Sequence, residues 1–241
     1  MSVLAEKTVR ELALENPAAT RMFEKLGIDY CCGGGQRLEQ ACEAAHVSTN
    51  QVVDALEAAS QVRSTTVPDR DWRAEPLSEL LAHIRSTHHV YTRDEIARLG
   101  PLFDKVCSVH GENHPELPRL REVFRPLAAE LTTHLMKEEM VLFPYILRME
   151  EAIVAEEPIL PLPFGSVRNP VAMMMHEHDG AGSALRSMRQ IAGDYSVPPD
   201  ACASFQTLYQ ALAAFEADLH QHIHLENNIL FPRAIEMERA H

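Results

Sequence analysis

The sequence has 241 residues, of which 46% are hydrophobic and 24% are charged, and its net charge is −13. This composition is typical of a globular protein with one large domain, or with one domain and a small appendage. The acidic charge argues against a nucleic-acid partner, because binding to phosphates requires clustered Lys and Arg side chains.

No apolar run is long enough to span a bilayer, so we expect no membrane partner. The first residues lack the basic-then-apolar order of a secretory signal. Five cysteines without regular spacing do not have the pattern of a disulfide framework. We therefore expect a protein of the reducing cytoplasm.

Helical spacing dominates the sequence, and the alternating pattern of strands is almost absent. Residues 1–65 contain several short helical stretches, interrupted at Asn16-Pro17 and by the glycine run 33–35. The stretch RSTTVPDRDWRAEP is polar and carries two prolines, which predicts a linker whose core we place at 66–76. The amino-terminal part is therefore expected to be a separate small helical domain.

Four long helical segments follow, and the periodicity places them near 77–110, 116–150, 170–193 and 199–238. Gly100-Pro101 is expected to kink or break the first segment. The stretch EEPILPLPFGSVRNP, with four prolines, separates the second segment from the third. Its length suits a crossover between two helix pairs, so the sequence predicts an all-α fold with a four-helix bundle in residues 77–241.

A short sequence occurs twice in the predicted bundle. HLMKEEMVLFP at 134–144 and HIHLENNILFP at 222–232 share a His, a Glu four residues later, and Leu-Phe-Pro at the end. A single His/Glu pair is most often a solvated surface pair. Two copies before the same apolar residues instead predict side chains that face the interior, where positions i and i+4 share one helix face. No Lys or Arg recurs at a matching offset to neutralise the buried carboxylates, so we interpret the pairs as metal ligands.

The spacing of the histidines identifies the remaining ligands. His89 lies 45 residues before His134, and His178 lies 44 residues before His222. This agreement selects His89 and His178 over their neighbours, which point to other helix faces and are expected to be solvated or to lie outside the ligand shell. The predicted ligands are His89, His134, Glu138, His178, His222 and Glu226.

Four imidazoles and two carboxylates are too many ligands for one tetrahedral zinc ion. They suit two metal ions, each with two His ligands, bridged by both carboxylates and by a solvent-derived oxygen. Imidazole with carboxylate favours iron among the redox metals, although the ligand types do not exclude manganese or zinc. The sequence thus predicts two non-haem, oxo-bridged iron ions per chain.

At these residues the chain resembles the hemerythrin-like di-iron bundle. The stretch DYCCGGG at 29–35 is similar to the amino-terminal motif of the ScdA/YtfE family, also called RIC for repair of iron centres. The resemblance covers residues 1–65 and 77–238, and it implies a small helical ScdA-type domain before the bundle and the same six ligands.

The resemblance also implies a function: restoring iron–sulfur clusters damaged by nitrosative or oxidative stress, through iron donation, NO binding or NO reduction. The expected partners are damaged iron–sulfur proteins and small molecules such as NO or O₂. It leaves open whether turnover is enzymatic and whether the chain forms a homodimer. The alternative is a sensor of oxygen, NO or iron that acts through a protein partner.

Oxygen-carrying hemerythrins have a fifth His one helical turn from the third-helix ligand, where this sequence has Met174 and Gly182. From this departure we expect a more symmetric and more exposed metal pair.

Cys31 and Cys32 are adjacent, and a disulfide between neighbours would strain the peptide. They are either small residues of a tight turn or, as the resemblance implies, functional thiols that take up NO, iron or oxidising equivalents.

Overall fold

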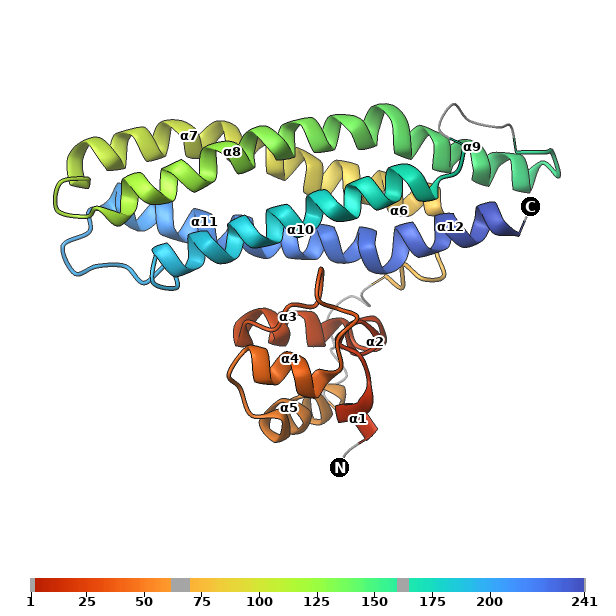
Figure 1. The fold of residues 1–241 in the computed structure, drawn as a ribbon, viewed down its shortest axis with the longest axis horizontal. Helices are drawn as coiled ribbons and strands as arrows, with labels where there is room; N and C mark the ends of the chain where they lie inside the picture. Colours follow the sequence, from red (N-terminus) through yellow and green to blue (C-terminus); the bar gives the residue numbers. More distant parts are fainter. Residues whose placement is uncertain (1–2, 62–69, 160–164, 241) are drawn as a thin grey trace.

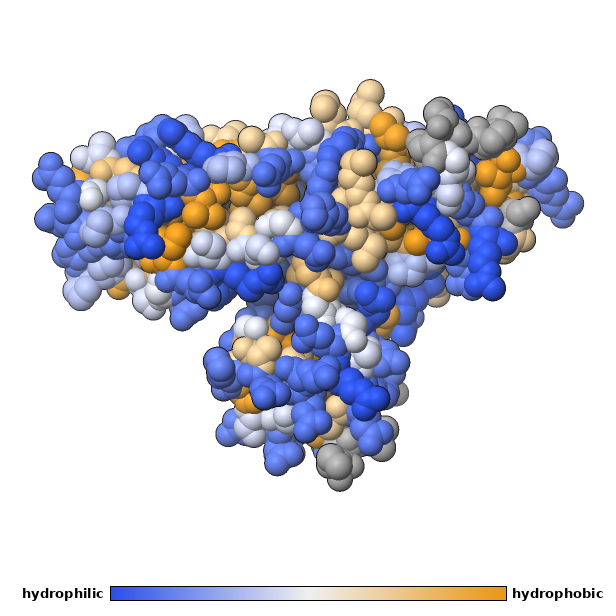
Figure 2. All heavy atoms as spheres, viewed as in Figure 1, coloured by the Kyte–Doolittle hydropathy of each residue, from blue (hydrophilic) through white to orange (hydrophobic). Residues whose placement is uncertain are grey.

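The computed structural model describes residues 3–61, 70–159 and 165–240. Within these ranges the regular secondary structure is helical, with no strand and an isolated bridge between Thr8 and Arg37, which confirms the predicted all-α fold. Four long helical rods form an elongated bundle, and a small helical domain lies against the middle of one of its sides (Figure 1). The space-filling view shows the resulting T shape, with a largely hydrophilic surface (Figure 2).

The small domain consists of five short helices. They are α1 (Val3–Glu6), α2 (Val9–Glu15), α3 (Pro17–Leu26), α4 (Leu38–Ala44) and α5 (Thr49–Gln61). Thr8 and Glu11 form a capping box that satisfies the first amides of α2. The domain has a hydrophobic core of its own, in which Val9, Phe23 and Leu38 are fully buried. The longest loop of this domain, between α3 and α4, carries the two adjacent cysteines.

The bundle is built from four helical rods, three of which contain a wider π-helical segment. The first rod is α6 (Leu77–His83), η1 (Ile84–His89) and α7 (Val90–His110); the second is α8 (Glu116–Lys137), η2 (Glu138–Leu142) and α9 (Phe143–Val154); the third is α10 (Arg168–Ile191); the fourth is α11 (Ala203–Leu225), η3 (Glu226–Leu230) and α12 (Phe231–Arg239). These rods agree with the four predicted segments to within four residues at each end.

Of the two outcomes expected at Gly100-Pro101, a kink or a break, the break does not occur, because α7 continues through both residues to His110. Pro101 removes one amide from the helical hydrogen-bond pattern, but it lies on the exposed face. Leu99 and Phe103 on the opposite face are fully buried and hold the helix against its neighbours. Packing therefore outweighs the local cost of the proline.

Two hydrophobic clusters fill the bundle, one toward each end. One includes Leu131 and Leu219, just before the repeated motifs. The other includes Leu142, Phe143 and Leu230, which belong to the Leu-Phe-Pro ends of the motifs. As predicted, these apolar residues are buried. The polar residues of the two motifs thus lie between two well-packed clusters, inside the bundle.

The predicted linker is only partly within the described residues, since 62–69 lie outside them. Its second half packs on the bundle: Trp72 stacks on His83 with ring centroids 4.5 Å apart. Arg233 donates hydrogen bonds to the carbonyls of Trp72 (2.8 Å) and Glu75 (2.7 Å). The chain is therefore held to the bundle before α6 begins. In the described part of the chain, no helix has the length and apolarity needed to cross a membrane.

Candidate metal centre

The three π-helical segments coincide with the predicted ligands. His89 is the last residue of η1, while Glu138 and Glu226 are the first residues of η2 and η3. A π-helical turn widens the helix by one residue and is often found at functional sites, because it turns a side chain away from its α-helical direction. The helices are thus locally distorted at the positions where the sequence predicts a metal.

The structure brings all six predicted residues together in the bundle interior, in two groups that share both carboxylates. One group is His89, Glu138, His222 and Glu226, and the other is His134, Glu138, His178 and Glu226. Within each group the candidate ligand atoms lie within 4.8 Å of one another. Each group contains one His from the first two rods and one His from the last two rods. Both copies of the duplicated sequence therefore contribute to both groups.

Each carboxylate reaches both groups with different oxygens. Glu138 places Oε2 3.4 Å from Nε2 of His89 and Oε1 3.3 Å from Nε2 of His134. Glu226 places Oε1 3.1 Å from Nε2 of His222 and Oε2 3.2 Å from Nε2 of His178. This is the arrangement of two carboxylates that bridge a pair of sites.

The spacing of these atoms suits ligands of a common cation. Nε2 of His89 is 3.2 Å from that of His222, and Nε2 of His178 is 3.0 Å from that of His134. Bonds of about 2.1 Å from a metal to nitrogen or oxygen place neighbouring octahedral ligands about 3.0 Å apart. Among the described residues, the polar atoms next to the four carboxylate oxygens of Glu138 and Glu226 are the Nε2 atoms of the four histidines, at 3.1–3.4 Å, and no other group donates a hydrogen bond to these oxygens. Buried carboxylates that face only imidazoles are costly unless protons or a metal cation neutralise them, so the residues present fit a metal site.

The six side chains of the site are enclosed, whereas the exposure of a metal pair relative to that of oxygen-carrying hemerythrins stays a prediction. His89, Glu138 and Glu226 have no exposed surface, and the other three predicted ligands are at most 3% exposed. The two hydrophobic clusters on either side close the bundle around the polar residues.

Burial and neighbouring charges compete in setting the pKa values at the site. Burial acts to lower the pKa of His134, but the carboxylates of Glu138 and Glu226 outweigh it and raise the pKa to about 9. Burial acts to raise the pKa of Glu226, but the adjacent His222 and His178 hold it well below its usual range. The pKa of His89 is lowered, by burial and then by the neighbouring His222. Without a cation, protons therefore neutralise part of the site.

Three of the four imidazoles are fixed by a hydrogen-bond acceptor on the far side of the ring. Nδ1 of His89 lies 2.8 Å from Glu139, Nδ1 of His134 lies 2.8 Å from Glu177, and Nδ1 of His178 lies 2.8 Å from Oδ1 of Asn227. Nδ1 of the fourth, His222, is buried and has no partner within the described chain. Such acceptors keep the proton on Nδ1 and turn the Nε2 lone pair toward the site.

The histidines set aside by the sequence argument do not join the ligand groups. His88 binds Asp218 through Nδ1 (3.0 Å) and stacks on His222. His176 is exposed, and His224 is buried with its pKa lowered to about 4, first by burial. His220 contacts Glu24 of the small domain at 2.9 Å. Part of this set therefore has a role that the sequence did not indicate: contacts between the bundle and the small domain.

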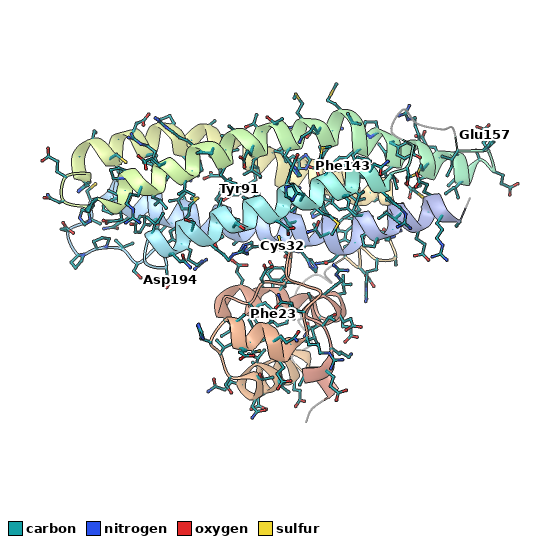
Figure 3. All side chains as sticks on the ribbon, viewed as in Figure 1. Phe23, Cys32, Tyr91, Phe143, Glu157 and Asp194 are labelled. Atoms are coloured by element: carbon teal, nitrogen blue, oxygen red, sulfur yellow. The ribbon has the colours of Figure 1, made fainter. Side chains whose placement is uncertain are left out.

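The two adjacent cysteines lie at this domain boundary, against α10 of the bundle (Figure 3). The Sγ of Cys32 lies 3.5 Å from the carbonyl oxygen of His178. The side-chain amide of Asn227 lies 3.4 Å from the carbonyl of Cys31, so it joins the cysteine loop to the ring of His178. Both cysteines are free thiols, with sulfurs 3.8 Å apart. The sequence left open whether the cysteines lie near the bundle site. In the structure Cys32 contacts the backbone of His178, which is one of the six predicted ligands.

A cavity of about 570 Å³ lies between α8 and α10 and reaches two of the predicted ligands. Leu127, Leu131 and Ala181 form its apolar wall, while His134 and His178 lie along it. Lys137 pairs with Glu177 at the same cavity. A small molecule can therefore approach the group formed by His134 and His178 from this side.

Comparison with known proteins agrees with this architecture. Residues 80–234 match the hemerythrin HHE cation binding domain, and residues 5–60 match ScdA_N, a domain of unknown function. The chain is thus a hemerythrin-type helical bundle preceded by a ScdA-type domain, as the resemblance implied.

Relatives match almost the full length of the chain. The iron-sulfur cluster repair protein YtfE of Yersinia pseudotuberculosis is 36% identical over 230 residues, covering 94% of this chain and 96% of its own. YtfE of Escherichia coli O81 is 34% identical over 231 residues, covering 95% and 97%. A probable iron-sulfur cluster repair protein of Haemophilus influenzae is 33% identical over 231 residues, covering 96% and 97%. The chain belongs to this YtfE family, which confirms the family predicted from the sequence.

Proposed function

We propose that this protein repairs iron–sulfur clusters damaged by nitrosative or oxidative stress, using a non-haem di-iron centre in its bundle. The relatives named for cluster repair support the proposal, and they match the whole chain. The observation that carries it is the buried pair of carboxylates, which face four imidazole Nε2 atoms and no other donor among the described residues. Damaged iron–sulfur proteins are then the partners, and NO or O₂ the small molecules.

In this proposal each half of the centre holds one iron. His89 and His222 would hold the first, His134 and His178 would hold the second, and Glu138 and Glu226 would each offer one carboxylate oxygen to either ion. Imidazole and carboxylate donors suit iron among the redox metals. The pair of irons supplies one-electron chemistry and open positions for a small molecule.

The chain's own residues then orient the ligands and control access. Glu139, Glu177 and Asn227 accept the Nδ1 proton of three ligand histidines and keep their Nε2 atoms available. The cavity beside His134 admits a diatomic molecule while the two hydrophobic clusters exclude bulk water from the rest of the site. NO binding or reduction and iron donation both need this combination of a closed site with one approach.

Cys31 and Cys32 are proposed to be the thiols that pass NO, iron or oxidising equivalents between the bundle and the outside. Their support is position: Cys32 contacts the backbone of a predicted ligand, His178, and is partly exposed. Cys31 is buried, and its pKa is raised, first by its hydrogen bond with Cys32 and then by burial, so it is a neutral thiol until a partner reacts with it. A thiol that carries no charge is the form expected in a closed domain boundary.

The test combines His134→Ala with His222→Ala, which removes one imidazole from each group. The variant is expected to lose both irons and, with them, the ability to reactivate an iron–sulfur enzyme inactivated by NO. His176→Ala is the matched control for iron content, because His176 lines the cavity beside His134 and lies two residues from a ligand without joining the ligand groups. Full repair activity in the iron-free double variant would disprove the proposal.

A second substitution separates repair from sensing through a partner. Cys31→Ser with Cys32→Ser leaves the six ligands in place, so iron content is expected to stay unchanged while repair is lost. Repair that persists in this variant would show that the thiols have no part in it, whereas a sensor would keep its response to NO, oxygen or iron without them.

A further inference from the structure

The loop that carries the two cysteines is organised around one carboxylate. Oδ1 of Asp29 accepts hydrogen bonds from the backbone amides of Cys31 (3.2 Å), Cys32 (2.9 Å) and Gly33 (2.9 Å). The same oxygen lies 3.4 Å from Sγ of Cys31. Three amide donors fix the position of the carboxylate within the loop that carries both sulfurs. Asp29, Cys31 and Cys32 thus offer three candidate ligand atoms within 4.8 Å of one another.

The bundle supplies a fourth donor atom. The carbonyl oxygen of His178 lies 3.5 Å from Sγ of Cys32, and Gly182, one turn later on α10, leaves room for that sulfur. A Cβ at Gly182 would lie 3.4 Å from the sulfur, so a larger residue would press on it. The fourth donor atom, a carbonyl oxygen, therefore comes from the rod that also presents the His178 ring to the bundle site.

Three of the six edges of a tetrahedral site with two sulfur and two oxygen ligands can be compared with the structure. Metal–sulfur bonds of about 2.3 Å and metal–oxygen bonds of about 2.0 Å give sulfur–sulfur edges of about 3.8 Å and sulfur–oxygen edges of about 3.5 Å. The observed sulfur–sulfur distance is 3.8 Å, and the two observed sulfur–oxygen distances are 3.4 Å and 3.5 Å. Thiol hydrogen bonds also fit such distances, so spectroscopy must distinguish the two arrangements.

We propose that Asp29, Cys31, Cys32 and the carbonyl oxygen of His178 form a second metal site, which binds one thiophilic divalent cation at the boundary between the two domains. Binding exchanges the two thiol protons for the cation, so the ligands become two thiolates and one carboxylate. Arg186, whose guanidinium lies 3.3 Å from Oδ2 of Asp29, offsets the remaining negative charge. The existence of this site does not depend on the proposed function.

Its use does rest on the proposed function. His178 would contribute its ring to the bundle centre and its backbone carbonyl to the boundary site, so the two sites share one residue. Iron that leaves the bundle on the side of His134 and His178 would then meet sulfur ligands next. Sulfur is the donor type that an iron–sulfur protein itself presents, which suits the boundary site to a step in iron transfer.

The experiment uses the full chain with His134→Ala and His222→Ala, titrated with Co²⁺ in the absence of oxygen. One equivalent of Co²⁺ is expected to bind with a sulfur-to-cobalt charge-transfer band in the near ultraviolet. The band is expected to disappear when Cys31→Ser and Cys32→Ser are added. Asp29→Asn is the finer variant, since its side-chain oxygen can still accept the three amide hydrogen bonds while the charge is lost; it should weaken binding roughly tenfold or more.

Two results would overturn the proposal. One is the absence of any charge-transfer band, and the other is a band that survives the loss of both cysteines and therefore belongs to another thiol. Should the bundle variant fold poorly, the intact protein is titrated past the saturation of its bundle site, and the thiolate band is then expected with the third equivalent of Co²⁺. Because this readout does not involve repair activity, it can succeed or fail independently of the proposed function.

Discussion

Asn227 is the residue through which the small domain reaches a predicted metal ligand, and replacing it with Leu tests that connection. Its Oδ1 lies 2.8 Å from Nδ1 of His178, and its Nδ2 lies 3.4 Å from the carbonyl of Cys31. The side chain is 4% exposed, so no solvent can replace the lost partner. Leu has a similar volume, which limits the change to the two hydrogen bonds.

The magnitude follows from the buried donor that the substitution leaves behind. An unsatisfied buried N–H costs about 1–3 kcal/mol, and each tenfold change in affinity corresponds to about 1.4 kcal/mol. We therefore expect Asn227→Leu to weaken metal binding at the group of His134 and His178 by roughly 10–100-fold, the range found when partners of metal ligands are removed. The group of His89 and His222 does not contact Asn227 through its imidazoles and should change less.

The assay is removal of iron from the loaded protein by a competing chelator, followed optically without oxygen. Wild-type protein and variant are compared, and the variant is expected to release one iron much faster than the other. Asn228→Leu is the control, because Asn228 binds the Tyr30 carbonyl at 3.1 Å and His224 at 2.8 Å but contacts no predicted ligand. Equal iron release from Asn227→Leu and wild type would refute the reasoning. If Asn227→Leu and Asn228→Leu release iron equally fast, the weaker iron binding comes from a disturbed contact between the small domain and the bundle instead.

Three further predictions concern the charge, reactivity and packing of the chain. The pKa of His134 is about 9 when folded, against about 6.5 unfolded, so its stabilising contribution is complete below pH 6.5 and disappears as the pH rises through 9. Metal-free protein should accordingly unfold at lower urea at pH 10 than at pH 6, and His134→Gln should flatten this difference. Cys202 is exposed and its pKa is lowered to about 7, first by the amide of Phe205 and then by His110. Mass spectrometry should find it alkylated before the other cysteines at pH 7, and a slower reaction than that of Cys107 would contradict this. Leu212→Ala should lower the free energy of unfolding by about 2–5 kcal/mol in urea titrations, because the side chain is fully buried.

Local helical geometry explains why so much of the metal centre was predictable from the sequence. The offset between His134 and Glu138 determines that both share one helix face, whatever surrounds them. The matching spacings of His89 and His178 to the next His then place all four rods in register. The Leu-Phe residues after each motif indicated the inward face, and their burial agrees. These inferences needed only periodicity and duplication.

Features that depend on contacts between distant segments were not predictable. No pattern in the sequence indicates that η1, η2 and η3 widen at the ligands, since a π-helical turn has no strong residue preference. The sequence also does not show that His220 and His224 face the small domain. Motif spacing describes which side chains meet, whereas the burial of the six candidate ligands depends on how closely the rods pack.

The duplication predicts two equal halves, but the acceptors behind the ligand histidines are unequal. The residue after Glu138 is Glu139, whose carboxylate lies against Nδ1 of His89. The residue after Glu226 is Asn227, whose amide oxygen lies against Nδ1 of His178. Glu177, the residue before His178, accepts a hydrogen bond from the ring of His134. His88, the residue before His89, only stacks on the ring of His222.

One half of the chain thus holds both histidines that are backed by carboxylates, and such backing makes imidazole a stronger donor. Because each metal group takes one His from each half, His89 is paired with His222, and His134 is paired with His178. Each group therefore combines one strong imidazole with one weaker one. Unequal halves in this way give each group one histidine backed by a carboxylate, and one difference that remains is the amide of Asn227, which backs His178 alone. That difference lies on the side of the centre that faces Cys31 and Cys32, where the small domain can act on it.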